Sequence, residues 1–290
     1  MRVTILYNPA AGDEEHSDRW LRRLVENAGH RAKLYVIEDG EFEEALERPA
    51  DLIVAAGGDG TVSRVAASLA GRGVPLAIVP LGIANNISTS LGVGGDAAGL
   101  VPGWPLARRR RLDVGEVQGP WGRTRFVESC GIGLLTRLMS LEIADHIDNV
   151  GDARALLRRL TADAAPVHWR VELDGEDVSG EYLLVEVMNI PTVGPNLRLA
   201  PSADSADGLL DVVLAGEGER AALLDYLDVR EPVEPPCLPL RRARRIALVC
   251  EPDGLHVDDA PQPAEVGSGP SVRVEIALLP DGVTVLVPCE

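Results

Sequence analysis

The sequence is poor in lysine, because its 290 residues include only Lys33 and every other basic side chain is an arginine. A Walker-A loop and a protein-kinase site each need a lysine on the nucleotide phosphates. Lys33 lies in "RAKLYVIE", with no glycine-rich loop before it. The sequence therefore excludes both classes, and Schiff-base chemistry is left with Lys33 alone.

Aromatic residues make up only 3% of the chain, although 46% of it is hydrophobic. The core is therefore expected to consist mainly of Leu, Val, Ile and Ala. With no signal peptide and no apolar run of about 18 residues, the sequence predicts a cytoplasmic protein that does not span a membrane. The four cysteines form no CxxC pair, which argues against a zinc site and favours reduced core thiols.

Basic charge is scarce overall, since 28 basic residues face 45 acidic ones and the net charge is −17. Such a surface repels nucleic acid, so no nucleic-acid partner is expected. The arginines nevertheless gather in two places, Arg108–Arg111 and Arg241–Arg245. These groups are either solvated strand entries or patches for phosphate or lipid headgroups.

The first 90 residues alternate between short apolar runs and helical patterns. The predicted strands are "VTILYN" (3–8), "KLYVIE" (33–38), "LIVAA" (52–56) and "PLAIVP" (75–80). Helical spacing follows Ser17, a plausible N-cap, and again covers 41–47 and 61–71. Such alternation predicts βαβ units and a parallel sheet, whose ligands gather at the carboxyl ends of the strands.

After about residue 112 strand-like runs and turn signals dominate, which predicts an antiparallel β domain. Two helical patterns interrupt it, at 134–147 and 152–165. The overlapping stretch 131–143 has enough Leu, Ile and Met to line an apolar pocket, although the same stripe is more often helix core.

A buried strand running into Gly57-Gly58-Asp59-Gly60-Thr61 and then a helix predicts an anion site. Glycines let a ligand approach the backbone, and the helix start points unpaired N–H groups at it. An aspartate there suits phosphate that carries Mg²⁺, and the Thr61 hydroxyl can cap the helix or donate to phosphate. The alternative is an ordinary βα turn. A second glycine and two amides follow the next strand in "PLGIANN" (80–86).

Four motifs together resemble the diacylglycerol kinase catalytic family, which includes bacterial lipid kinases and sphingosine kinases. They are "NPAAG" (8–12), "GGDGTV" (57–62), "PLGIANN" (80–86) and "RLDVGEV" (111–117). NAD kinases share the GGDGT loop more distantly. The resemblance implies a three-layer α/β nucleotide-binding domain over 1–112, to which 280–290 return, and a mainly antiparallel β-sandwich-like domain over 113–279.

The resemblance also implies roles for individual residues. Nucleotide contacts fall on Asn8, Gly12, Gly57, Gly58, Asp59, Gly60, Thr61, Gly82 and Asn85, and Asp59 with Asp113 organises Mg²⁺. Asp207, with Asp204 nearby, matches a structural metal position, for which an Asx turn is the alternative. Asp258 matches the base that accepts the proton of the acceptor hydroxyl, with Asp259 as a stand-in. A solvated hairpin turn is the alternative for that pair.

The implied reaction is transfer of the ATP γ-phosphoryl group to the hydroxyl of diacylglycerol, ceramide or a related lipid alcohol. Such an enzyme belongs to phospholipid biosynthesis, meets its lipid acceptor at a membrane surface, and is peripheral to that membrane. A homodimer is a further expectation at family level.

Four positions depart from the family pattern: Glu38, Arg64, Ile83 and Ala260. Ile83 and Ala260 replace polar groups, whereas Arg64 can reach a phosphate bidentately. Two alternatives to a lipid kinase therefore stay open. One is a catalytically weak or inactive relative that binds nucleotide or lipid. The other is a kinase of a soluble alcohol, which the charge of −17 favours because it opposes anionic membranes.

Overall fold

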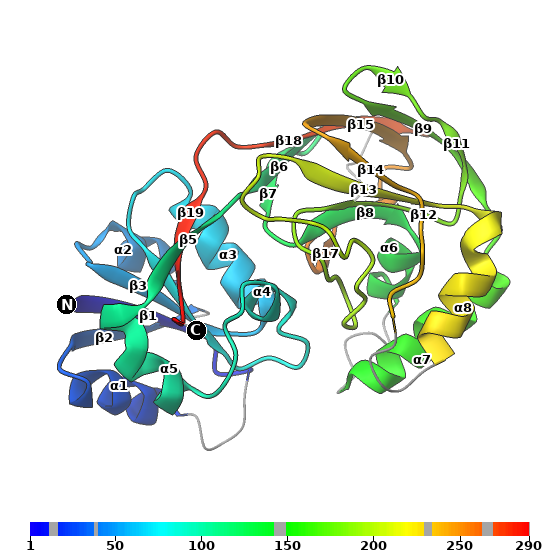
Figure 1. Cartoon of the computed structure of the whole chain (residues 1–290). Helices are drawn as coiled ribbons and strands as arrows, with labels where there is room; N and C mark the ends of the chain where they lie inside the picture. Colours follow the sequence, from blue (N-terminus) through cyan, green and yellow to red (C-terminus); the bar gives the residue numbers. More distant parts are fainter. Residues whose placement is uncertain (12–16, 38–39, 142–148, 229–233, 263–268, 290) are drawn as a thin grey trace. The chain divides into compact units, whose positions relative to one another are not determined.

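This computed structural model describes residues 1–11, 17–37, 40–141, 149–228, 234–262 and 269–289. The chain folds into two compact units. Unit 1 comprises Met1–Val114 with Pro280–Glu290, and unit 2 comprises Gly115–Leu279. Figure 1 follows the chain through both units, and the red final strand β19 lies beside β5 in the blue and green unit 1.

Unit 1 is built on a six-stranded sheet with the order β2-β1-β3-β4-β19-β5. Its strands are β1 (Arg2–Tyr7), β2 (Arg31–Val36), β3 (Leu52–Gly57), β4 (Leu76–Pro80), β5 (Arg108–Leu112) and β19 (Val283–Val287). All neighbours pair in parallel except β19 and β5, which are antiparallel. All six residues of β3 are buried, as expected for a central parallel strand covered on both faces.

Helices cover both faces of this sheet. They are α1 (Asp18–Asn27), α2 (Phe42–Glu47), α3 (Asp59–Leu69), α4 (Asn86–Ser90) and α5 (Ala97–Gly103), followed by a 3-10 turn, η2 (Trp104–Leu106). Leu21 and Val25 of α1 pack with Val54 of β3 in one core cluster. Successive residues of a strand point to opposite faces of the sheet. Ile53 and Ala55 of β3 therefore face away from α1, and they are buried as well. Helix α3 contacts β3, which fits its packing on that opposite face. The predicted three-layer α/β architecture is confirmed.

Unit 2 pairs two antiparallel sheets. The first has the order β10-β9-β15-β18-β6-β7, with β11 on β9, and the second β14-β13-β12-β8-β16-β17. The first sheet comprises β6 (Gly115–Gly119), β7 (Gly122–Phe126), β9 (Val167–Leu173), β10 (Glu176–Asp177), β11 (Gly180–Tyr182), β15 (Arg245–Cys250) and β18 (Val272–Leu278). The second comprises β8 (Ser129–Gly133), β12 (Leu184–Met188), β13 (Leu210–Ala215), β14 (Leu240–Ala243), β16 (Leu255–Val257) and β17 (Ala260–Pro261).

The core of unit 2 lies between these sheets, where Phe126 and Val274 meet Ile132 and Val185. The other face of the second sheet packs against α6 (Leu134–Met139), α7 (Val150–Asp163) and α8 (Arg220–Asp228), and the 3-10 turn η4 (Glu217–Glu219) precedes α8. Leu134, Leu135 and Leu138 of α6 are buried in that packing, so these leucines are helix core. The predicted β-sandwich-like domain is confirmed. No described helix is long and apolar enough to cross a bilayer.

A buried polar row crosses the second sheet of unit 2. Register places Glu186 of β12 and His256 of β16 on either side of Gly131 of β8. His256 Nε2 lies 3.1 Å from Glu186 Oε1, and both residues are fully buried. The two side chains meet over Gly131, where a Cβ atom would lie 2.1 Å from Glu186 Oε2. A glycine is therefore required at position 131.

We predict that Gly131→Ala destabilises unit 2. The added methyl group also meets the backbone oxygen of Val185 at 2.7 Å, so the sheet must shift. Overpacking of this kind costs about 1–3 kcal/mol, measurable by chemical denaturation. Gly218→Ala is the matched control, because nothing lies within 4 Å of a Cβ atom at that position. Equal stability of the two variants would contradict the prediction.

Candidate functional site

The predicted anion loop lies at the carboxyl ends of β3 and β4 in unit 1. Gly58 is the extended N-cap of α3, and Asp59, Gly60 and Thr61 form its first turn. The Thr61 side chain is buried and accepts a hydrogen bond from Asn8 Nδ2 at 3.2 Å. Asn8 follows β1, and its own backbone N–H donates to Ala56 O of β3. The loops after β1 and β3 are therefore joined by hydrogen bonds from Asn8.

The loops after β3 and β4 touch backbone to backbone at Gly58 and Gly82. A Cβ atom on Gly82 would lie only 2.5 Å from Gly58 Cα, so a side chain at position 82 would force the loops apart. Leu81 N–H donates to Gly57 O at 2.9 Å and fixes the approach. The shared edge leaves the start of α3 lined by backbone rather than side chains, which suits a phosphate group.

Asn85 and Asp59 hold this second loop in shape. Asn85 adopts a left-handed conformation with φ of 50°, and its side chain accepts from Gly82 N–H and donates to Gly82 O. Asp59 accepts from the N–H groups of Asn86 and Ile87, one on each carboxylate oxygen, at 2.9 Å. Asp59 thus joins the start of α3 to the start of α4.

The predicted metal positions of unit 1 are engaged with protein groups. Besides the amide contacts of Asp59, the buried Asp113 accepts a hydrogen bond from Arg111 Nε at 2.6 Å. Across the described ranges, no three or more His, Cys, Asp or Glu side chains gather as a metal ion requires. The described residues therefore form no cage of three or more such ligands at this loop.

Two departures from the family pattern have clear positions in the structure. The Arg64 guanidinium stacks on the Phe42 ring of α2, 4.1 Å from its centroid. In this conformation Arg64 is a packing residue of the α3 surface, and its predicted phosphate contact requires a different rotamer. Ile83 is 62% exposed, an unusual state for a large apolar side chain. Gly12 and Glu38 lie outside the described residues.

The predicted base lies in unit 2, at the two-residue turn between β16 and β17. Asp258 has a φ of 50° and is 8% exposed. Its carboxylate accepts from the N–H groups of Val127, Glu128 and Ser129 at 2.8–3.2 Å. Asp259, beside it, is exposed. The turn predicted as the alternative is therefore present, but only one of its two carboxylates is solvated.

Sequence reasoning missed the polar groups around this turn. Asn189 Nδ2 donates to Val127 O, and Glu128 Oε1 accepts from Gly194 N–H, so both side chains brace the strand that Asp258 holds. Neither residue belongs to a motif with characteristic spacing. The only signal in the sequence for either residue is its place as a polar residue at one end of an apolar strand.

A buried thiol lies against the same network. Burial, with the charges of Glu186 and Asp258, raises the pKa of Cys130 well above its usual value. His256 Nδ1 also lies 2.9 Å from Thr136 Oγ1. Cys130 and Cys250 are buried thiols as expected, but Cys237 and Cys289 are exposed, so the expectation of core thiols is wrong for those two.

The second predicted metal position does not fit a cation in this structure. Asp204 accepts from Ala206 N–H and Asp207 from Leu209 N–H, which are the Asx turns given as the alternative. Asp207 also pairs with Arg242 of β14. Arg242 lies opposite the buried Asp211 in register, with Nε 3.8 Å from its carboxylate. An arginine therefore supplies the positive charge here.

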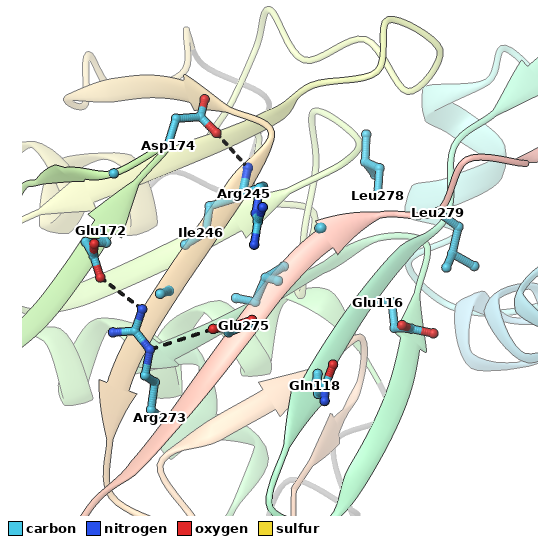
Figure 2. A pocket seen from close by; sticks show the side chains of 14 residues that line it. Glu116, Gln118, Glu172, Asp174, Arg245, Ile246, Arg273, Glu275, Leu278 and Leu279 are labelled. Atoms are coloured by element: carbon cyan, nitrogen blue, oxygen red, sulfur yellow. Dashed lines mark hydrogen bonds and ion pairs between the residues drawn. The ribbon is translucent and has the colours of Figure 1, made fainter.

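A hollow of about 640 Å³ on the outer face of the first sheet of unit 2 contains none of the predicted nucleotide, metal or base residues, although Arg245 of the second arginine group lines it (Figure 2). Arg273 donates to Glu172 at 2.9 Å and pairs with Glu275 at 3.9 Å. Asp174 accepts from Arg245 N–H. These charges largely compensate one another within the face, which is typical of a solvated sheet surface.

We predict that Asp59→Ala destabilises unit 1 by about 1–3 kcal/mol, because the buried N–H groups of Asn86 and Ile87 lose their acceptor. Asp59→Asn keeps one acceptor oxygen and should lose less. Chemical denaturation measures both, with Glu43→Ala at an exposed position of α2 as the control. If Asp59→Ala matches the control, the bracing role is wrong.

We also predict that unit 2 needs no divalent cation near Asp207. Mg²⁺, Ca²⁺ or a chelator should leave the melting temperature unchanged, because Arg242 already pairs with that carboxylate. Arg242→Ala should lower stability by about 1 kcal/mol or more, since burial already raises the pKa of Asp211 and the variant removes its nearby cation. A rise of several degrees in the wild type with either ion would overturn this assignment.

Comparison with known proteins matches both units. A diacylglycerol kinase from Bacillus subtilis is 28% identical over 245 residues, which cover 79% of this chain and 77% of the relative. A solved diacylglycerol kinase structure from Bacillus anthracis superposes with a TM-score of 0.73 at 22% identity, covering 99% of this chain and 96% of that one. Yeast NADH kinase superposes with a TM-score of 0.53 at 10% identity, covering 100% and 84%. These two superpositions show the fold alone.

Two family profiles match the sequence in succession. Residues 2–117 match the diacylglycerol kinase catalytic domain, and residues 151–285 match the YegS C-terminal NAD kinase beta sandwich-like domain. The first match contains the loops joined by Asn8, Gly58 and Asp59, and the second contains the Asp258 turn. The chain therefore combines a diacylglycerol kinase catalytic domain with a YegS-type C-terminal domain.

Proposed function

We propose that this protein is a lipid kinase that transfers the γ-phosphoryl group of MgATP to the hydroxyl of diacylglycerol or a related lipid alcohol. The observation that supports it most strongly is the backbone contact of Gly58 with Gly82 at the start of α3. This contact places no side chain between the two loops, so a polyphosphate could approach the backbone at the start of a helix. The names of the relatives add the acceptor class, since the Bacillus subtilis protein is a diacylglycerol kinase.

The described loops suit the binding of a triphosphate. The N–H groups in the first turn of α3 have no partner within the helix and can donate to phosphate oxygens. Mg²⁺ is part of the substrate, where it neutralises charge on the phosphates. Asp59 lies in that same turn, held by two amides, so a water between its carboxylate and the ion is the contact we propose. Asp113 is the second acidic group proposed for this role.

Proton removal from the acceptor hydroxyl is proposed for Asp258. Three amide donors fix its carboxylate in position and stabilise its charge, so the group is preorganised rather than mobile. The exposed Asp259 is the competing candidate, because its oxygens are solvated. The left-handed φ of Asp258 favours a functional constraint on this turn, since non-glycine residues rarely adopt it.

The direct test is incubation with labelled ATP, Mg²⁺ and diacylglycerol or ceramide in mixed micelles, followed by separation of the lipid products. We expect a phosphorylated lipid. Asp258→Asn should lower kcat by about 10²- to 10⁴-fold, the usual loss when a general base is removed. Its amide oxygen still accepts from the three N–H groups, so the melting temperature should change little. Asp259→Asn is the matched control and should keep most activity.

Each other result has a definite meaning. A larger loss in Asp259→Asn would transfer the base role to Asp259. Full activity in both variants would remove the base from this turn. No product across a panel of lipids, with folded protein, would reject the lipid kinase. Saturable phosphorylation of a water-soluble alcohol in its place would identify a soluble-alcohol kinase.

The surroundings of Ile83 and Arg64 favour a second candidate function, which is nucleotide binding without catalysis. Ile83 presents no hydroxyl at the second loop, and Arg64 is engaged by Phe42. An inactive relative that only binds nucleotide would be stabilised thermally by MgATP without forming product. Restoring polarity with Ile83→Thr distinguishes the two, since it should raise turnover in a weak kinase and leave a pure binding protein inactive.

A further inference from the structure

The edge of the unit 1 sheet carries four consecutive arginines on β5. Arg108, Arg109 and Arg111 are exposed and Arg110 is half-buried. The strand pairs only with β19 in the described sheet, in a register that sets Arg108 opposite Val287. Arg111 also pairs with the buried Asp113. The four consecutive arginines concentrate basic charge on this edge. In a chain of net charge −17, such a concentration is a local exception.

A hollow of about 660 Å³ lies along this strand. It is lined by Arg108–Arg110, by Thr89–Gly92 at the end of α4, and by Val287–Cys289. Thr89 is exposed, and Ser90 Oγ has no hydrogen-bond partner among the described residues. Guanidinium and hydroxyl groups around one hollow are the donors that a phosphate headgroup requires.

An exposed apolar side chain lies beside the hollow. Leu106 is 81% exposed, the highest value among the large hydrophobic side chains of the described residues. Cys289, which lines the hollow, donates from Sγ to Leu106 O at 2.9 Å, so Leu106 lies beside its rim. An exposed leucine side chain is unfavourable in water, and insertion into an apolar phase would remove that cost.

We propose that Leu106 with Arg108–Arg110, here called the arginine edge, docks the protein onto anionic membrane surfaces. Headgroup phosphates occupy the hollow and Leu106 enters the interface. This inference rests on the proposed function, because a lipid kinase must reach an acceptor held in a bilayer. The opposite end of α4 donates to Asp59, so one helix of about 7 Å separates the hollow from the phosphate loop.

Membrane lipid fits these observations better than nucleic acid. A nucleic acid would need a longer basic track and would meet a repulsive chain of net charge −17. It would also give no role to an exposed leucine, whereas an amphipathic edge of arginine and leucine is suited to an interface. A simply solvated edge strand explains the arginines but not the exposure of Leu106.

The test is sedimentation of the full chain with two kinds of vesicle, phosphatidylcholine alone and equal parts of phosphatidylcholine and phosphatidylglycerol. We expect binding to the anionic vesicles only, weakened by added salt. Each arginine near such a surface contributes about fivefold in affinity. The variant Arg108→Ala/Arg109→Ala/Arg110→Ala should therefore lose on the order of a hundredfold, and Leu106→Ser several-fold.

The matched control removes the same charge elsewhere: Arg241→Ala/Arg244→Ala/Arg273→Ala, all exposed in unit 2. It should bind the anionic vesicles as the wild type does. Equal loss in both triple variants would reduce the effect to net charge and overturn the proposal. So would undiminished binding by the arginine-edge variant, or tighter binding of that edge to duplex DNA than to vesicles.

A parallel assay separates this proposal from the kinase. Turnover of a short-chain diacylglycerol that is dispersed in water does not require docking, so the arginine-edge variant should retain it while losing turnover on anionic vesicles. If no lipid is phosphorylated but the variant still loses vesicle binding, the kinase proposal fails and the docking proposal stands. Equal turnover by wild type and variant on vesicles would overturn the docking role in catalysis.

Discussion

The nucleotide unit depends on one carboxylate that bridges two helix starts. Asp59 belongs to the first turn of α3 and accepts from the first two N–H groups of α4. The contact allows the loops after β3 and β4 to meet at Gly58 and Gly82 without a side chain between them. A negative charge at two helix starts is electrostatically favourable. The residue that a nucleotide site would use toward Mg²⁺ is therefore also the residue that assembles the site.

Unit 2 uses the same device at its own turn. The Asp258 carboxylate accepts from three successive N–H groups, those of Val127, Glu128 and Ser129, at the start of β8. The Glu186–His256 pair then crosses β8 over Gly131, two residues after Ser129. Buried polar groups of this kind are costly unless satisfied, so they specify one register for β8, β12 and β16. A base attached to so rigid a sheet would be held in place before substrate arrives.

Much of unit 1 could be predicted because its signals are local. Alternating strands and helices, the Ser17 cap and the glycine loops each arise from a few adjacent residues, and the parallel sheet followed from them. The three-layer arrangement came from the resemblance to a known family. The contacts that define the sites were less accessible. Arg242 beside Asp207, Arg64 on Phe42 and the amides around Asp258 are set by strand register and helix packing between distant segments. Motif spacing contains no information about such partners, so the sequence identified positions but not their surroundings.

The place of β19 has a consequence for synthesis of the chain. This strand is the last in sequence, yet it inserts between β4 and β5 in the first unit. While the ribosome is still translating unit 2, β4 has an open edge and β5 has no ladder partner in the described sheet. Unit 1 can therefore become complete only after residues 283–287 have been synthesised and have left the ribosome. Unit 2 is a continuous segment and has all its strands earlier. Maturation would thus proceed from the second unit to the first, against the direction of translation.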